Sequence, residues 1–410
     1  MTAPGSAPEE CLICLAGKSN IGCDALRYLV RRFGPDRLVI IPNADDPGFA
    51  TWQQSIRSTA DRLGVREVAL GDVYPVENLL LLSLEFDKLL RPARFASRRL
   101  FNIHFSYLPK YKGMYTSIWP ILNDESGSGV TLHHIDRGID TGDVVAQKAF
   151  ALTSDNTSRE LYFKYSQAAY EILLENFEDL LHDRQFARPQ SATGSTYYSR
   201  GSIDFSKPKV VDFRSTAHQV RNYVRAFAFP EYQLPVAFGC PVYRAELTER
   251  LSQGPAGTVV QADEQSFVVN TIDYDVRVLK DHSRALFEAV EAGDSPEAQR
   301  LASLTHNINV SNRNGWSALM IASWQHHIEI AHTLVEQGAD VNQANLNGTS
   351  VLMYAKDGAV RSGDTSLLEY LVARGADASW TDVSGRTVSD YCRASNQVEL
   401  AEYFDALVPR

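Results

Sequence analysis

Asparagine, histidine and serine occupy alternate positions in the segment 101–106, which has the sequence Phe-Asn-Ile-His-Phe-Ser. If this segment is a β-strand, Asn102, His104 and Ser106 share one face and the apolar residues share the other. A histidine beside an asparagine supplies a proton acceptor and an amide that can polarise a carbonyl group. Asp136, Asp140 and Asp143 follow on a glycine-rich turn, and a carboxylate there can orient the imidazole and favour its charged form. Acyl transfer needs this set of groups.

The segment has no serine or cysteine at the position expected of a nucleophile. Ser106 is on the right face but lies two residues beyond His104. We therefore expect the attacking group to come from the substrate, and an amine is the simplest proposal. Taken singly, a histidine in a strand is more often a hydrogen-bonded core residue, and an Asp-Gly turn is more often only a turn. Their combination favours a catalytic interpretation.

The elements that must position these residues form a predicted doubly wound α/β domain. Apolar strand patterns alternate with helical patterns, which indicates a mostly parallel sheet. The expected strands cover residues 10–16, 37–42, 65–70, 78–84, 100–106, 129–135 and 144–152, and the expected helices cover residues 25–33, 51–63 and 158–182. Because Pro109 cannot continue a ladder, the polar face of segment 100–106 ends at the carboxyl end of its strand, where open α/β sheets bind ligands.

The turn after the first strand, Gly-Lys-Ser at 17–19, matches neither common nucleotide motif. Leu12 stands where a phosphate loop needs its first glycine, and Gly17 and Gly22 do not form a dinucleotide fingerprint. We interpret the segment as a tight strand-to-helix turn, with Asn20 as a candidate pocket residue.

Two further parts follow the first domain. Residues 184–200 are polar and rich in small residues, which predicts a linker. A short helix at 215–226 and short strand patterns between residues 236 and 279 predict a small β-rich module.

The last part of the chain repeats. Asn-Gly-Trp-Ser-Ala-Leu at 314–319 recurs as Asn-Gly-Thr-Ser-Val-Leu at 347–352, so Gly315 and Gly348 are 33 residues apart. This period, with Gly-Ala-Asp at 338–340 and again at 375–377, resembles the ankyrin repeat. Gly348 and Gly385 are 37 residues apart, so we place four extra residues in a loop at 358–364. Residues 285–304 are expected to form an N-terminal capping unit.

Composition limits the partners. The formal net charge is −10 and no long Lys/Arg run is present, so we expect no nucleic acid bound through its phosphates. The most apolar run, residues 79–84, is far shorter than a membrane span, so we expect no membrane association. Five scattered cysteines fit a reducing cytoplasm, and the Cys-x-x-Cys at 11–14 has no second ligand pair, so we predict no metal site.

Three patterns together resemble one enzyme family. N-x-H-x-S-x-L-P-x-x-x-G begins at Asn102, G-V-T-x-H begins at Gly129, and D-x-G-I-D-T-G begins at Asp136. They resemble the formyltetrahydrofolate-dependent formyltransferases over residues 8–185. The resemblance implies that Asn102 polarises the formyl carbonyl, that His104 assists proton movement at the tetrahedral intermediate, and that Asp140 orients His104.

The same resemblance implies N10-formyltetrahydrofolate as the formyl donor. Its pterin is expected between the strand end at residues 84–86 and the turn at residues 135–140. The cofactor-binding residues implied in this way are Phe86, Ile135, Asp136 and Asp140, with His133 as a supporting residue.

A narrower resemblance points to the acceptor. K-G-M-Y-T-S-I-W-P at 112–120, R-A-F-A-F-P-E-Y-Q-L-P at 225–235 and the ankyrin array resemble bacterial N-formyltransferases for dTDP-linked amino sugars, those with ankyrin repeats being most like the enzymes for 3-amino-3,6-dideoxyhexoses in surface polysaccharide or O-antigen synthesis. Gly113, Met114, Tyr115 and Thr116 would open a helix and offer N–H groups to the pyrophosphate. The remaining substrate-binding residues implied are Asn222, Arg225, Phe229 and Tyr232, whose aromatic members are equally explained by core packing.

We therefore predict a Rossmann-like formyltransferase domain at residues 1–185, a linker and β-rich dimerisation and nucleotide-binding module at 186–282, and helical ankyrin repeats at 283–410. A homodimer is expected through the middle module. The ankyrin array is a candidate site for a second nucleotide or a neighbouring subunit, through Trp316, Trp324, His326 and His327. The alternatives are a dTDP-4-amino-4,6-dideoxyhexose N-formyltransferase, a methionyl-tRNA formyltransferase and a non-catalytic ankyrin scaffold.

Overall fold

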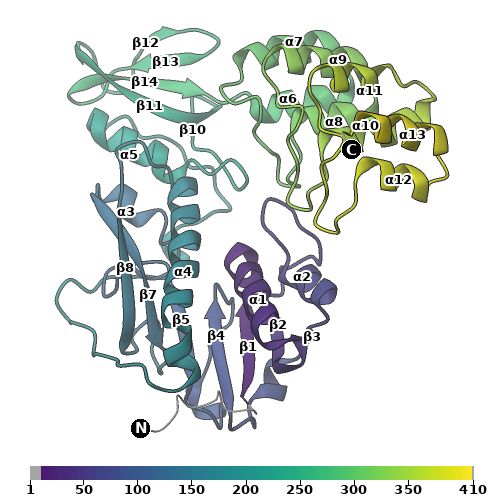
Figure 1. Cartoon of the computed structure of the whole chain (residues 1–410). Helices are drawn as coiled ribbons and strands as arrows, with labels where there is room; N and C mark the ends of the chain where they lie inside the picture. The colour runs from purple at the N-terminus through teal and green to yellow at the C-terminus, as the bar shows by residue number, and fades with distance from the viewer. Residues whose placement is uncertain (1–10, 409–410) are drawn as a thin grey trace.

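A seven-stranded sheet is the scaffold of the N-terminal half of the computed structural model, which describes residues 11–408 (Figure 1). Its strands are β1 (Leu12–Gly17), β2 (Leu38–Pro42), β3 (Arg66–Glu67), β4 (Leu79–Leu84), β5 (Leu100–His104), β7 (Gly127–His134) and β8 (Val144–Ala151). The order across the sheet is β3-β2-β1-β4-β5-β7-β8. β1 to β5 run parallel, whereas β7 and β8 are antiparallel to their neighbours.

The predicted doubly wound, mostly parallel sheet is confirmed, with differences at strand ends. β3 covers two residues of the strand expected at 65–70, and β5 ends at His104 rather than Ser106. Glu10, where the first strand is expected to begin, lies outside the described residues.

The two faces of this sheet bury different groups. Helices α1 (Ser19–Phe33), α2 (Ile56–Leu63) and α4 (Ser158–Leu181) pack on one face, and Phe101 and Ile103 of β5 belong to the hydrophobic cluster there. Leu100 belongs to a second cluster on the opposite face. Because side chains alternate along a strand, Asn102 and His104 leave β5 on this second face. The predicted separation of a polar face from a core face is confirmed.

The helix expected over residues 51–63 begins only at Ile56. Ser55 is its N-cap, and the Ser55 hydroxyl accepts a hydrogen bond from the Ser58 N–H (3.0 Å). The Asp46 carboxylate accepts from Ser55 Oγ (2.6 Å) and from the Ile56 N–H (2.9 Å). These bonds satisfy N–H groups of the first turn and set where the helix starts. Residues 51–54 form a loop instead.

α4 is the predicted closing helix of this domain. It begins with a capping box, in which Thr157 Oγ1 accepts from the Glu160 N–H (3.4 Å) and the Glu160 carboxylate accepts from the Thr157 N–H (2.5 Å). Shorter helical elements are α3 (Trp119–Leu122) and the 3-10 turns Pro35–Arg37, Leu70–Val73, Pro92–Arg94 and Arg200–Ser202. No helix within residues 11–408 is both long and apolar enough to cross a membrane.

The middle module is an antiparallel sheet covered by one helix. Helix α5 (Ala217–Phe227) packs on β11 and β14 of the sheet. The strands, in their order across the sheet, are β10 (Val236–Ala237), β11 (Cys240–Leu251), β14 (Tyr274–Lys280), β13 (Ser266–Val269) and β12 (Val259–Ala262). Val220 and Val224 of α5 share one cluster with Val242, Val276 and Val278 of the strands. The predicted β-rich module is confirmed.

The segment predicted as a linker is attached to the catalytic half. The N–H groups of Val144 and Arg188 each donate to the other residue's carbonyl (2.8 and 2.9 Å). Gln190 Nε2 donates to the carbonyls of Asp140 and Gly142 (2.9 and 2.8 Å). Strand β9 (Tyr197–Tyr198) pairs with β6 (Lys112–Gly113). The segment therefore holds the turn that carries Asp140.

The C-terminal part is a stack of helix pairs, as the repeat predicts. They are α6 (Ser283–Ala292) with α7 (Ser295–Leu304), α8 (Ala318–Gln325) with α9 (Ile328–Glu336), α10 (Val351–Ser362) with α11 (Ser366–Ala373), and α12 (Val388–Ala394) with α13 (Val398–Leu407). The four extra residues lengthen α10 rather than a loop. Gly358 lies inside this helix, where an added Cβ would come within 2.5 Å of the Ser323 carbonyl oxygen.

Candidate active site

The pairing of β5 with β7 assembles the polar face. Asn102 lies opposite His133, and His104 lies opposite Thr131. Asn102 Nδ2 is 3.1 Å from His133 Nε2. His133 Nδ1 lies 2.8 Å from the His134 carbonyl, which only accepts, so Nδ1 carries the proton and Nε2 is left to accept from Asn102. His133 therefore holds the Asn102 carboxamide in place.

The Asp140 side chain contacts residues of both β5 and β6. Its Oδ1 lies 3.4 Å from Asn102 Nδ2 and 3.5 Å from His104 Nδ1, and its Oδ2 accepts from the Gly113 N–H (2.9 Å). The structure thus brings together the predicted trio of Asn102, His104 and Asp140. Asp136, the other carboxylate predicted for the site, is exposed and accepts from the Gly138 N–H (3.0 Å) and Thr141 Oγ1 (2.7 Å) within its own turn.

Charge explains the state of Asp140. Burial alone would raise the pKa of this carboxyl, but the His104 charge and the hydrogen bond from the Gly113 N–H hold its pKa well below the usual range. His104 Nε2 lies 2.9 Å from the Tyr111 carbonyl and therefore donates to it. His104 Nδ1, facing the carboxylate, is the ring nitrogen at which a proton can be held or released.

The residues predicted to contact a pterin lie on the same face of the sheet. Phe86 and Ile135 are both half-buried and pack against the cluster that contains Leu100. Asn43 fixes the main chain after β4, since its Nδ2 donates to the Glu85 carbonyl (2.9 Å) and its Oδ1 accepts from the Asp87 N–H (3.1 Å).

The segment from Gly113 to Thr116 does not open a helix, because α3 begins at Trp119. The Gly113 N–H donates to Asp140, and the Met114 N–H donates to the Tyr198 carbonyl (2.8 Å). Two of the N–H donors predicted for a pyrophosphate are therefore engaged within the protein. The hydroxyl of Tyr115 donates to the Arg200 carbonyl (3.2 Å), and the Thr116 carbonyl accepts from Tyr165 (3.3 Å).

Comparison with known proteins identifies the family. A family model described as formyl transferase matches residues 80–177, and a model of ankyrin repeats matches residues 259–345. The crystal structure of WlaRD, a sugar 3N-formyl transferase, in the presence of dTDP and 5-N-formyl-THF, is 37% identical over 66% of this chain and 98% of its own, with a TM-score of 0.62. This chain belongs to the formyl transferase family. The N-formyltransferase from Helicobacter canadensis, in complex with folinic acid and dTDP-3-aminofucose, is 35% identical over 66% of this formyltransferase and 99% of its own chain, with a TM-score of 0.61.

The ankyrin match and the ankyrin helices have different limits. The match begins at residue 259, within β12, whereas the helix pairs of the formyltransferase begin with α6 and continue to α13. Each solved relative aligns with 66% of the chain, so about a third of the chain lies outside each alignment.

Asn222 and Arg225 of the formyltransferase are held by each other and by their surroundings. Both are buried, and Arg225 Nε donates to Asn222 Oδ1 (3.0 Å). The Arg225 guanidinium also donates to Asp124 (3.2 Å) and to the carbonyls of Thr153 and Asn156 (3.4 and 3.3 Å). These bonds tie α5 to the catalytic half, so the donors predicted to bind a nucleotide already have partners.

Phe229 and Tyr232 form an aromatic wall with Trp52, a residue that the sequence patterns did not indicate. The Trp52 ring is 5.3 Å from Phe229 and 5.0 Å from Tyr232, measured between centroids. Phe229 is buried, whereas Tyr232 is 50% exposed. Phe229 therefore packs as core, and Tyr232 and Trp52 keep ring surface available.

A polar cluster at the carboxyl ends of β1 and β4 lies beside this wall. Ser19 Oγ and the Tyr162 hydroxyl both donate to the Glu85 carboxylate, and Lys18 pairs with Asp45 (3.0 Å). Burial raises the pKa of Glu85, against the lowering effect of those hydrogen bonds and of the Lys18 charge.

The charges of the cluster also reach the aromatic wall. Burial raises the pKa of Tyr232, and Lys18 and Glu85 act on its hydroxyl with opposite signs. The strand order explains the position of the cluster. β1 pairs with β2 on one side and with β4 on the other, so the switch point of the sheet lies between β1 and β4, where the cluster is found. That order is visible only in the fold.

The ankyrin residues singled out by sequence lie near the two ends of helix α8. Trp316 packs against Trp324 (6.0 Å between centroids) and Tyr354 (5.1 Å), and His326 Nε2 lies 3.5 Å from the Asp364 carboxylate. His327 lies beneath Gly293. Binding of a second nucleotide or a neighbouring subunit here stays a prediction.

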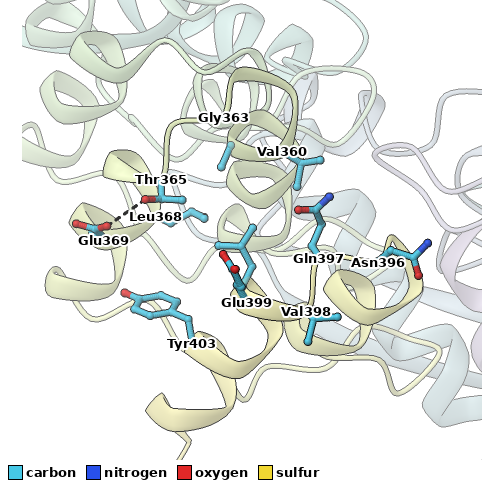
Figure 2. A pocket seen from close by; sticks show the side chains of 12 residues that line it. Val360, Gly363, Thr365, Leu368, Glu369, Asn396, Gln397, Val398, Glu399 and Tyr403 are labelled. Carbon is cyan, nitrogen blue, oxygen red and sulfur yellow. Dashed lines mark hydrogen bonds between the residues drawn. The ribbon is translucent and has the colours of Figure 1, made fainter.

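A separate hollow lies between the last helix pairs. Leu368, Glu369, Glu399 and Tyr403 are among the residues that line it (Figure 2). The predicted site residues lie elsewhere in the described chain. The hollow therefore has no part in the candidate site.

Proposed function

We propose that this formyltransferase moves a formyl group from N10-formyltetrahydrofolate to the 3-amino group of a dTDP-linked 3-amino-3,6-dideoxyhexose. The observation that carries the proposal is the Asn102–His104–Asp140 cluster, in a chain that aligns with nearly the whole of a sugar 3N-formyl transferase. The second solved relative holds folinic acid together with dTDP-3-aminofucose, which supports both the donor class and the acceptor class.

The donor, when bound, supplies the formyl carbonyl that the amine attacks. Asn102 has one short contact to His133 and a longer one to Asp140 (3.4 Å), so the N–H of the longer contact is the one that can turn to a carbonyl oxygen. His104 Nδ1 takes up or releases the proton that moves during the reaction. Asp140 stays ionised and orients the imidazole.

Residues on the catalytic face fit a folate ring system. The half-buried side chains of Phe86 and Ile135 give an apolar surface on the face that carries Asn102. We infer that Phe86 and Ile135 contact the pterin and that Asp140 stands at its reactive end. Asp136 is better explained as the residue that holds the turn.

For the acceptor, we infer a nucleotide subsite at the aromatic wall. Tyr232 and Trp52 have ring surface for thymine, and Lys18 supplies a cation at the same edge of the sheet for the pyrophosphate. The end of β1 lies two strand spacings, about 10 Å, from β5, the strand that carries Asn102 and His104. Gly17 pairs with Leu84, and Leu84 pairs with Ile103. A nucleotide there can place its sugar near His104.

An assay of product identity tests the proposal. The protein is incubated with N10-formyltetrahydrofolate and a panel of dTDP-3-amino and dTDP-4-amino sugars, and the sugar nucleotides are weighed by mass spectrometry. We expect a gain of one formyl group on a 3-amino sugar. Formylation of 4-amino sugars alone would replace the acceptor, and no formylated product with any sugar would refute the function.

We further infer that the protein is a homodimer through the middle module. Apolar side chains are exposed on β11, β12, β14 and the turn before β14, namely Leu247, Leu251, Val259, Val260, Ile272 and Tyr274. A surface of this kind marks an interface in a protein that stays in solution.

A further inference from the structure

The turn before α8, residues 312–316, reaches from the ankyrin array to the catalytic half; we name it the first finger. Arg313 Nε donates to the Glu231 carbonyl (2.9 Å), and Arg313 Nη2 donates to the Tyr232 carbonyl (2.5 Å). The Glu231 side chain is buried and bonded by Arg159 Nε of α4 (2.7 and 2.9 Å). Residues 231–232 are thus held from two sides, by α4 and by the ankyrin array.

A second contact joins the first finger to the loop at residues 51–54. Gly315 has a φ of 78°, and an added Cβ would lie 2.5 Å from the Thr51 carbonyl oxygen. Such a close approach admits only glycine. Trp52, the next residue, packs on Tyr232. The first finger therefore touches both segments that build the aromatic wall, and its loop is seen extending toward the loop above α2 (Figure 1).

Hydrogen bonds connect this wall to the sheet edge. Gln53 Nε2 donates to the Tyr162 hydroxyl (2.6 Å), and that hydroxyl donates to the Glu85 carboxylate (3.0 Å) at the end of β4. The contact chain from Gly315 to Glu85 runs through packed or hydrogen-bonded neighbours at every step. Order imposed on the wall by the first finger therefore extends to the carboxyl edge of the sheet.

The repeat itself shows that Arg313 departs from the pattern. The equivalent positions in the next two fingers are Leu346 and Val383. Gly348, equivalent to Gly315, approaches Asp382 of the following finger (2.8 Å from an added Cβ to Cα) rather than the catalytic half. The stacking of repeats does not need an arginine here. The side chain of Arg313 bonds residues 231 and 232 instead.

We propose that Arg313 is a positioning residue for the acceptor nucleotide, and that the first ankyrin finger completes the subsite formed by Trp52 and Tyr232. The inference rests on the proposed function. Arg313 fixes the main chain of Tyr232, and Gly315 fixes that of Trp52, so that the two rings are ordered before the nucleotide arrives. Preorganisation of this kind strengthens binding without adding contacts to the ligand.

Arg313→Leu tests the proposal, because leucine is the residue of the next finger and is compatible with the ankyrin stack. We expect KM for the dTDP-3-amino sugar to rise about tenfold, the scale of losing charge-assisted hydrogen bonds. KM for the formyl donor, kcat and Tm should stay near the wild-type values. Amide hydrogen exchange of the ligand-free protein should become faster at residues 51–54 and 231–233.

The matched control is Arg284→Leu. Arg284 is an exposed arginine of α6 that pairs with Glu288 on its own helix (2.9 Å). Arg284→Leu should leave both KM values and the amide hydrogen exchange of the aromatic wall unchanged. Unchanged acceptor KM and unchanged exchange in Arg313→Leu would overturn the proposal, and so would equal losses for donor and acceptor with a lowered Tm. If the wild-type enzyme formylates no dTDP-amino sugar, the proposed function fails, while the exchange experiment still decides whether Arg313 orders the wall.

Discussion

At the scale of single residues, the candidate site depends on how one carboxylate is shared. Asp140 Oδ1 faces both Asn102 and His104, and its Oδ2 anchors the Gly113 N–H. A left-handed backbone at Asp140 (φ 53°) turns the side chain into this position, a conformation that aspartate tolerates better than most residues. The same carboxylate therefore orders the catalytic groups and the loop that covers them.

Alanine substitutions of the two catalytic candidates should abolish most turnover. We expect Asn102→Ala to lower kcat by about 10²–10³ and His104→Ala by about 10²–10⁴, because each loses a group that acts on the reacting atoms. Single-turnover rates at saturating substrates are the measurement.

Ser106→Ala is the control for this pair. Ser106 is buried, and its hydroxyl donates to the Lys110 carbonyl (2.7 Å). Ser106→Ala should lower the unfolding free energy by about 1 kcal/mol. It should keep kcat within about twofold, since Ser106 touches no reacting group. Near-wild-type turnover in His104→Ala would contradict the assigned role.

The lowered pKa of Asp140 makes a prediction about acid stability. Its folded pKa lies below the unfolded value of about 3.9. The stabilisation is therefore complete above that unfolded value and is lost as pH falls toward the folded pKa, because the unfolded chain binds a proton first. The difference in unfolding free energy between wild type and Asp140→Asn should shrink by up to about 1.4 kcal/mol per pH unit below about pH 4.

Urea unfolding at a series of pH values measures this difference. Asp61→Asn is the control, since Asp61 is an exposed aspartate on α2. Its difference from wild type should stay small and constant. A constant difference for Asp140→Asn as well would show that the carboxylate makes no net favourable interaction in the folded state.

At the scale of elements, the strands that carry the chemistry were predictable and the connections were not. The alternation of residues 101–106 and the helical pattern of residues 158–182 are local, so they predicted β5 and α4. The start of α2 depends on Asp46, which is nine residues before Ser55. The attachment of residues 188–198 depends on partners in β6 and β8, which no local pattern reveals.

The acceptor side illustrates the same limit. Arg225 and Phe229 were predicted to bind the substrate, but tertiary contacts decide that one bonds Asn222 and Asp124 and the other packs beside Trp52. Lys18, Trp52 and Glu85 come from three loops that meet only because β1 lies between β2 and β4. A sequence pattern can mark a catalytic strand, whereas a subsite assembled from loops needs the strand order.

At the scale of the whole molecule, the repeat predicted the ankyrin array, but it could not predict how the array meets the catalytic half. The contacts of Arg313 and Gly315 place the first finger against the aromatic wall. In the middle sheet, β12 is an exposed edge strand (Figure 1).

We expect two copies of the chain to associate through the exposed edge of β12. All four residues of β12 are exposed, and an unpaired strand edge with apolar side chains is a template for a second strand. We expect sedimentation equilibrium to give a dimer for the full chain. Val260→Lys should shift it to the monomer, because a charge would be buried at the interface.

Val210→Lys is the matched control. Val210 is 62% exposed in the same module but lies outside the named strands, so the same substitution there should leave the dimer intact. The aromatic wall and the catalytic trio are built from one chain, so a monomeric Val260→Lys variant should keep its kcat. A wild-type chain that sediments as a monomer at all concentrations would rule out the interface. A monomeric variant without activity would show that the second copy supports the site.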